Sequence, residues 1–180
     1  MSWVTIIWAM SAAVSLTLGA IHLVVWFQDR KAWANVLFSV TAVAVATFAV
    51  FELLLMQAET VAQFAVLHRW AHLSFFVLLV SMVGFVLFYF RSGRVWLAWT
   101  VIGLRVVVLI INFATAPSFN YRAITGLVPF QFLGETVSVP VAVPSPWARL
   151  GEGSGLLLLI FIADASIRDR KSTRLNSSHG

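Results

Sequence analysis

A run of about 20 apolar residues interrupted by one arginine constrains this chain more than any other feature. Residues 94–113 read RVWLAWTVIGLRVVVLIINF, the length that an α-helix needs to cross a bilayer. Arg105 lies near its middle and keeps its charge, so lipid exposure costs at least ~2.5–3.5 kcal/mol. Asn112 follows two helical turns later, on the same helix face. We therefore expect other helices to supply polar partners to this face.

The composition predicts an integral membrane protein. Of 180 residues, 61% are hydrophobic and only 11% are charged, a balance foreign to soluble domains of this size. The formal net charge of +5 comes from basic residues scattered near helix ends, so we expect no nucleic-acid partner. The lipid bilayer is the expected partner. Apolar runs predict an all-α, polytopic transmembrane bundle of five spans, at residues 3–26, 34–56, 70–90, 94–113 and 147–167.

The segment between the last two spans differs from the rest of the chain. Residues 114–146 contain Pro140, Pro144 and Pro146, so a continuous helix is excluded there. The alternating apolar residues predict an extended cap that lies on the bundle. Its aromatic and apolar content argues against disorder, and a connection of this length is often functional.

Basic residues between the spans predict the orientation. Six lie on one predicted side and three on the other, which places the first side in the cytoplasm. The N-terminus is then extracytoplasmic. The first side carries Arg30, Lys31, Arg91, Arg94, Arg168 and Arg170, and the second carries Arg69, Arg122 and Arg149.

With this topology, the polar residues of the spans sort into two groups by depth. A pair, His22 and Asp164, is expected in the cytoplasmic half. A larger cluster is expected in the outer half beneath the cap, where ionisable residues are candidates for function. Its members are Glu52, His68, Arg69, His72, Arg105 and Asn112.

Two interpretations of the outer cluster remain open. It is either a ligand- or signal-binding pocket, or a structural ion pair between Glu52 and Arg105 with Arg69 reaching the head groups. The i, i+4 spacing of His68 and His72 suits a metal ion, with Glu52 as a third ligand. The fixed charge of Arg105 disfavours a cation, and suits an anion, a carboxylate or a quinone head group better. We therefore assign no metal, and His22–Asp164 is either a functional pair or a packing contact.

Several chemistries have no sequence support. No lysine lies inside a span, no cysteine is present, and phosphate-binding, dinucleotide-binding and HExxH motifs are absent. Two histidines at similar depth on different helices, as bis-histidine haem requires, are not expected either. We assign no catalytic residue and no cofactor to this chain.

Three apolar segments carry a family resemblance, and they read GAIHLVVWFQDRKAWANVLFSVTAVAVATFAVFEL, HRWAHLSFFVLLV and GRVWLAWTVIGLRVVVLIINF. FLGE and a helix ending in DAS follow. Over residues 15–170 the pattern resembles the N-terminal seven-transmembrane sensor region of bacterial PAS-containing two-component histidine kinases. The resemblance implies two further helices, a PAS domain and a kinase after Arg170, a homodimer, the inner membrane, and a response regulator acting through those later domains.

The last ten residues depart from this pattern. Residues 171–180 read KSTRLNSSHG and resemble a translated sequencing adapter, as in a metagenomic fragment. We expect this polar, helix-poor tail to be non-native and residues 1–170 to be an incomplete sensor module. The predicted role is signal input to a kinase by helix repacking. The alternatives are a stand-alone small transporter, a membrane redox protein, or a membrane scaffold.

Overall fold

The chain forms five long helices and one β-hairpin in the computed structural model, which describes residues 2–90 and 93–177. All five helices are long and apolar enough to span a membrane, which confirms the predicted all-α polytopic bundle. The elements are α1 (Trp3–Gln28), α2 (Trp33–Met56), α3 (Val61–Phe90), α4 (Val95–Ala114), β1 (Tyr121–Phe132), β2 (Glu135–Pro144) and α5 (Ala148–Ser177).

Two helix boundaries differ from the prediction. Helix α3 begins at Val61 instead of residue 70, and its 30 residues make it about 15 Å longer than the apolar core of a bilayer. Helix α5 continues to Ser177, so the tail expected to be helix-poor is helical up to that residue. Residues 178–180 of that tail, and Arg91 of the orientation count, lie outside the described residues.

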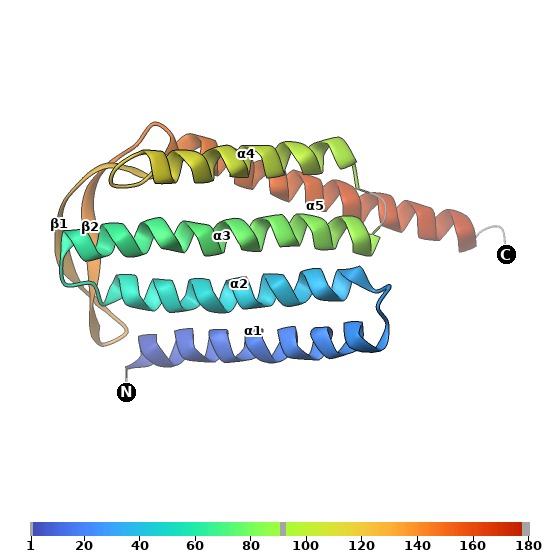
Figure 1. Ribbon diagram of the computed structural model, residues 1–180, viewed down its shortest axis with the longest axis horizontal. Coiled ribbons are helices and arrows are strands. Elements are labelled where there is room, and N and C mark those ends of the chain that lie inside the picture. Colours follow the sequence, from blue (N-terminus) through green and yellow to red (C-terminus); the bar gives the residue numbers. More distant parts are fainter. Residues whose placement is uncertain (1, 91–92, 178–180) are drawn as a thin grey trace.

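The helices α1 to α4 lie side by side in chain order, and α5 crosses α4 at an angle (Figure 1). Helix α3 is therefore between α2 and α4, and it also contacts α5. The N-terminus and the hairpin are at one end of the bundle, and the C-terminus is at the other (Figure 1).

Small residues bring α1 close to α2. A Cβ added to Gly19 would lie 3.1 Å from the Cβ of Ala42, so the two backbones approach closely. The hydroxyl of Ser39 donates a hydrogen bond of 2.8 Å to the carbonyl of Gly19. Helices without a hydrophobic driving force between them associate through such contacts.

A larger apolar core joins α3, α4 and α5 in the half of the bundle away from the hairpin. Val83 of α3, Ala98 of α4, and Phe161 and Ala165 of α5 have no exposed surface. This contact fixes α5 against α3 at that end. At the hairpin end, the glycine-rich start of α5 lies instead against α4, through Arg105.

The expected extended cap is an antiparallel β-hairpin. Its strands pair from Tyr121–Pro144 to Phe132–Glu135, with register irregularities near Tyr121 and Ile124. Leu133 and Gly134 form the tight turn with φ values of 52° and 79°, the two positive angles that a type I′ turn requires.

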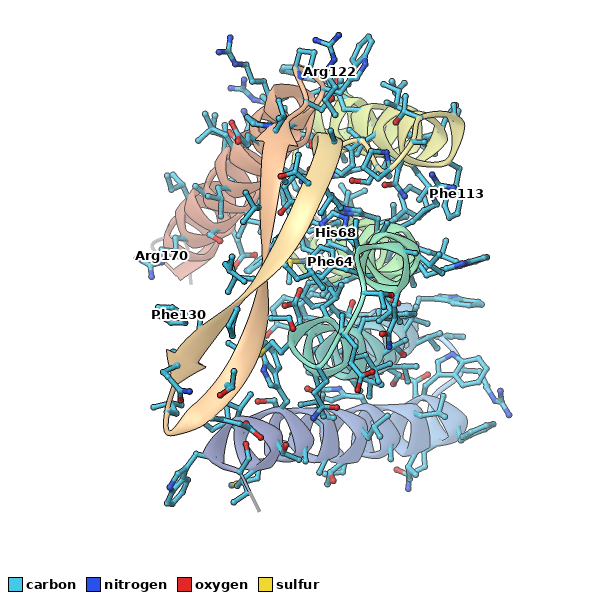
Figure 2. The ribbon with its side chains drawn as sticks, turned by 90° about the vertical axis from the view of Figure 1, so that its left-hand side faces the viewer. Phe64, His68, Phe113, Arg122, Phe130 and Arg170 are labelled. Atoms are coloured by element: carbon cyan, nitrogen blue, oxygen red, sulfur yellow. The ribbon has the colours of Figure 1, made fainter. Side chains whose placement is uncertain are left out.

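The hairpin crosses the end of the bundle, from the end of α4 and the start of α5 to the start of α1 (Figure 2). The hydroxyl of Ser138 donates a 2.6 Å hydrogen bond to the carbonyl of Ala58, between α2 and α3. Near the turn, Ser2 donates to the carboxylate of Glu135. Tyr121, Ile124 and Leu127 pack on a small core that includes Phe64 and Ala71. The hairpin thus covers the polar outer part of α3.

Candidate functional site

Arg105 is buried in the middle of α4, eleven residues into its twenty. Its side chain is only 6% exposed, and its Nη2 donates a 3.1 Å hydrogen bond to the carbonyl of Gly151 on α5. Its guanidinium carbon lies 5.3 Å from the ring centre of Phe75 on α3. Its Nε is buried without a hydrogen-bond partner among the described residues. No described carboxylate lies within ion-pair distance of Arg105.

Small residues at the start of α5 make room for the guanidinium. A Cβ on Gly155 would lie 3.4 Å from Nη2 of Arg105, so the Arg105 side chain lies directly on the surface of α5. Gly151 accepts a second hydrogen bond at its carbonyl, 2.8 Å from the hydroxyl of the fully buried Ser154. The carbonyl of Gly151 therefore accepts from both Arg105 and Ser154. This one acceptor does not satisfy all the N–H donors of the charged guanidinium.

His68 and His72 meet at one amide of the cap. Nδ2 of Asn120 lies 3.2 Å from Nε2 of His72 and 3.5 Å from Nε2 of His68. The two rings are perpendicular, with centres 4.7 Å apart. With the amide in this orientation, both imidazoles accept at Nε2 and carry their proton on Nδ1. His68 Nδ1 is then a buried donor without a partner among the described residues.

Arg69 and Asn112 anchor the start of the cap. Nη2 of Arg69 donates to the carbonyls of Thr115 and Pro117, at 3.0 and 3.2 Å. Asn112 is fully buried, and its amide donates to the carbonyl of Arg69 at 3.0 Å and accepts from the backbone N–H of Phe119 at 3.4 Å. These bonds connect α3, α4 and the connection after α4. Nε of Arg69 also lacks a partner among the described residues, but Arg69 does not line the pocket described below.

Glu52 is half-buried near the end of α2 and lies on the other side of α3 from Arg105. The described residues contain no ion pair between the two, so the structure does not form the structural pair that was one of the two interpretations. Glu52 acts on the cap instead. Burial raises the pKa of the Tyr121 phenol above its ordinary value, and the negative charge of Glu52 raises it further.

A pocket of about 540 Å³ lies beneath the base of the hairpin. Three helices and the cap contribute to its wall, and its volume is typical of a small-molecule site. Figure 2 shows this end of the bundle, where the hairpin runs diagonally and His68 and Phe64 are labelled between it and the end of α3. The polar side chains of the wall are His72, Arg105, Asn120, Tyr121 and Glu152, and its apolar part includes Phe75, Phe119 and Pro144.

The expected cytoplasmic pair of His22 with Asp164 is not formed. Nδ1 of His22 lies 2.8 Å from the side-chain oxygen of Asn35 on α2. Asp164 is 3.5 Å from Arg94 and 3.1 Å from Arg168. The two residues are far apart because α1 and α5 lie on opposite sides of the row of helices (Figure 1).

The structure therefore divides the predicted cluster into three parts. His72 and Arg105 line the pocket, and His68 contacts the lining residue Asn120. Arg69 and Asn112 hold the cap, and Glu52 lies near Tyr121. Among the described residues, no group of three histidine, cysteine or acidic side chains is arranged to hold a metal ion.

Sequence reasoning missed the pocket residues from the cap and from α5. Asn120, Tyr121 and Glu152 were not named as site residues, although Asn120 and Tyr121 are adjacent and follow the fourth span closely. The spacing of Gly151 and Gly155, one helical turn apart, was the available signal for a surface that admits a bulky partner. A comparison of the chain with protein-family models, with curated proteins and with solved structures found no match.

Proposed function

We propose that this chain is the membrane-embedded signal-input module of a bacterial two-component histidine kinase. In this proposal the module detects a signal in the membrane or the periplasm and transmits it by helix repacking to cytoplasmic domains encoded beyond Arg170. The supporting residues are those that carry the resemblance, over residues 15–170. The proposed location is the inner membrane, with the N-terminus and the hairpin outside, because six basic residues against three favour that orientation.

The observation that carries the proposal is the pocket that joins four separate elements. Helices α3, α4 and α5 and the hairpin all contribute to its wall. A molecule bound there contacts three helices that also pack on one another in the apolar core away from the hairpin. Binding more tightly to one arrangement of these elements than to another shifts their population, which is the requirement for signalling. Helix α5 then carries the change to the opposite end of the bundle (Figure 1).

The transporter alternative has less support. Transporters commonly bind substrate at interrupted helices near the middle of the membrane. Each described helix, by contrast, is continuous from its first to its last residue, and the pocket extends from the base of the hairpin to Arg105 on α4.

Sequencing of the source DNA across the codon for Arg170 tests the assignment to a kinase. The expected result is an open frame that continues through further apolar spans into PAS and kinase sequence. A stop codon directly after the fifth helix, in place of that frame, would overturn the assignment.

Kinase output of the recovered full-length protein tests the role of the pocket. We expect Arg105→Gln to change autophosphorylation or its response to membrane conditions, because the variant removes the charge from the pocket wall. Arg30→Gln is the matched control, since Arg30 lies over Trp26 and Phe27 at the other end of the bundle. Equal output from Arg105→Gln, Arg30→Gln and wild type, at equal expression, would mean that the pocket has no sensory role.

A further inference from the structure

We propose that the pocket beneath the hairpin binds an organic monocarboxylate, with its carboxylate paired to Arg105 and its apolar body on the neighbouring aromatic side chains. This inference rests on the proposed function in that it names the ligand class of the same pocket. The binding itself is measurable on this chain alone.

The first argument is the incomplete environment of a fixed charge. Arg105 is only 6% exposed. Its hydrogen bond goes to the backbone carbonyl of Gly151, which also accepts a bond from Ser154. Among the described residues, the buried Nε of Arg105 has no hydrogen-bond partner and no acidic side chain forms an ion pair with Arg105. A guanidinium cannot lose its charge inside proteins, so burial without a counter-charge is unfavourable. A bound carboxylate accepts two parallel N–H bonds and supplies the missing charge.

The second argument is the size and lining of the pocket. A volume of about 540 Å³ holds a small organic molecule and is far larger than a single inorganic anion needs. Phe75, Phe119, Tyr121 and Pro144 give the wall an apolar and aromatic surface around Arg105. The ligand is therefore an anion with an apolar body, and not phosphate, sulfate or chloride.

The third argument is the position of a single acidic residue. Glu152 lines the pocket and is exposed, one residue after the carbonyl that Arg105 contacts. Its charge repels a second carboxylate on the same ligand, because like charges at close range disfavour each other. A monocarboxylate pairs its one negative charge with Arg105 and leaves only its apolar end near Glu152, so it is favoured over a dicarboxylate.

Two sources supply this chemistry, a fatty acid from the bilayer and an aromatic acid from water. The 180-residue chain, in phosphatidylcholine nanodiscs, is tested by equilibrium dialysis with radiolabelled decanoate and phenylacetate. Decanol and phenylethanol are the neutral probes, decanedioate is the dicarboxylate probe, and empty nanodiscs correct for partitioning into lipid. Saturable binding of decanoate alone assigns the bilayer source, and binding of phenylacetate alone assigns the aqueous source.

The variants separate charge pairing from general apolar binding. Arg105→Gln is expected to weaken carboxylate binding by about tenfold or more, which is a change of one unit in log Kd. Arg105→Lys keeps the positive charge but loses the planar pair of N–H donors, and it is expected to retain intermediate affinity for the carboxylate. Glu152→Gln is expected to tighten binding, most of all for decanedioate. Arg94→Gln, which removes a cation paired to Asp164 at the other end, is the matched control and is expected to bind like wild type.

Three results would overturn the inference: no saturable binding of either carboxylate, equal affinity in wild type and Arg105→Gln, or equal affinity for the acid and its alcohol. Should Arg105→Gln fail to fold, two other results still test carboxylate binding in the pocket: the comparison of acid with alcohol, and the affinity of Glu152→Gln. A loss of kinase response in Arg105→Gln without carboxylate binding overturns the ligand class alone. Carboxylate binding with unchanged kinase output overturns the sensory role alone.

Discussion

Arg105 on α4 and Gly151 on α5 are joined by a hydrogen bond of 3.1 Å between a side chain in the middle of one helix and the backbone at the start of the next. Among the glycines at the start of α5, Gly155 lies nearest to the guanidinium, and a Cβ there would be in van der Waals contact with Nη2 at 3.4 Å. The hydrogen bond to Gly151 places the charge of Arg105 at the pocket wall instead of in lipid. The interface between α4 and α5 near the hairpin is thus built around one arginine.

Replacement of Gly151 by alanine is expected to destabilise the fold. The added Cβ would lie 2.8 Å from the ring of Phe119, which is buried, so the ring must move. Overpacking of this kind costs about 1–3 kcal/mol. Gly153→Ala is the matched control two residues on, where a Cβ meets nothing within 4 Å and alanine favours the helix.

Thermal unfolding of both glycine variants in detergent micelles measures this difference. The midpoint of Gly151→Ala is expected below wild type, and that of Gly153→Ala at or above it. Equal midpoints for the two variants would mean that Phe119 is not held against α5.

Replacement of Asn112 by leucine is expected to loosen the cap. The variant removes the bond to the carbonyl of Arg69, which keeps its partner within α3, and leaves the buried N–H of Phe119 without its bond to Asn112. The expected loss in the free energy of unfolding is about 1–3 kcal/mol. Faster hydrogen exchange in residues 115–121 is the local measurement.

Thr100→Val is the matched control on the same helix. Thr100 is exposed and donates only to the carbonyl of Trp96 within its own helix, so little change is expected. Protection of residues 115–121 that is the same in Asn112→Leu and Thr100→Val would contradict the anchoring role of Asn112.

The five spans were predictable from the sequence, whereas the lateral neighbours of their polar residues were not. Hydropathy places Glu52 and Arg105 towards the same end, but α3 lies between their helices and blocks an ion pair. His22 and Asp164 fail to meet for the same reason. The order of helices in a membrane depends on side-chain packing, and a hydropathy pattern does not encode it.

The cap was predictable in character and not in detail. Pro140 and Pro144 indicated extended backbone, and the alternating valines that separate them are typical of a strand. The turn was obscured because Leu133, a residue that rarely takes positive φ, occupies one of its two central positions. The predicted third span was placed to begin too late, at residue 70, because Gln63, His68 and Arg69 are polar; the hairpin covers that part of the helix.

Titration of Tyr121 tests the influence of Glu52 on the cap. The midpoint is expected above 10.0, its ordinary value, because burial and then the Glu52 carboxylate disfavour the phenolate. Glu52→Gln removes the negative charge and is expected to lower the pKa of Tyr121. The pKa is expected to stay above 10.0 in that variant, since burial is the larger cause.

Ultraviolet absorbance of the phenolate measures this titration. The chain has two tyrosines, so a Tyr89→Phe background leaves Tyr121 as the only one. Glu59→Gln is the matched control, an exposed carboxylate at the same end of the bundle. A pKa of Tyr121 that moves equally in Glu52→Gln and Glu59→Gln would contradict a specific effect of Glu52.

The proposed orientation predicts which end of the bundle a membrane-impermeant thiol reagent reaches. The chain has no cysteine, so each single-cysteine variant carries one reactive thiol and the wild type is an unlabelled control. Gln131→Cys places a thiol at an exposed position near the hairpin turn, and Lys31→Cys places one between α1 and α2 at the other end. In right-side-out spheroplasts we expect rapid labelling of Gln131→Cys, and labelling of Lys31→Cys only after permeabilisation. The reverse pattern would place the hairpin and its pocket in the cytoplasm, where a periplasmic signal does not reach them.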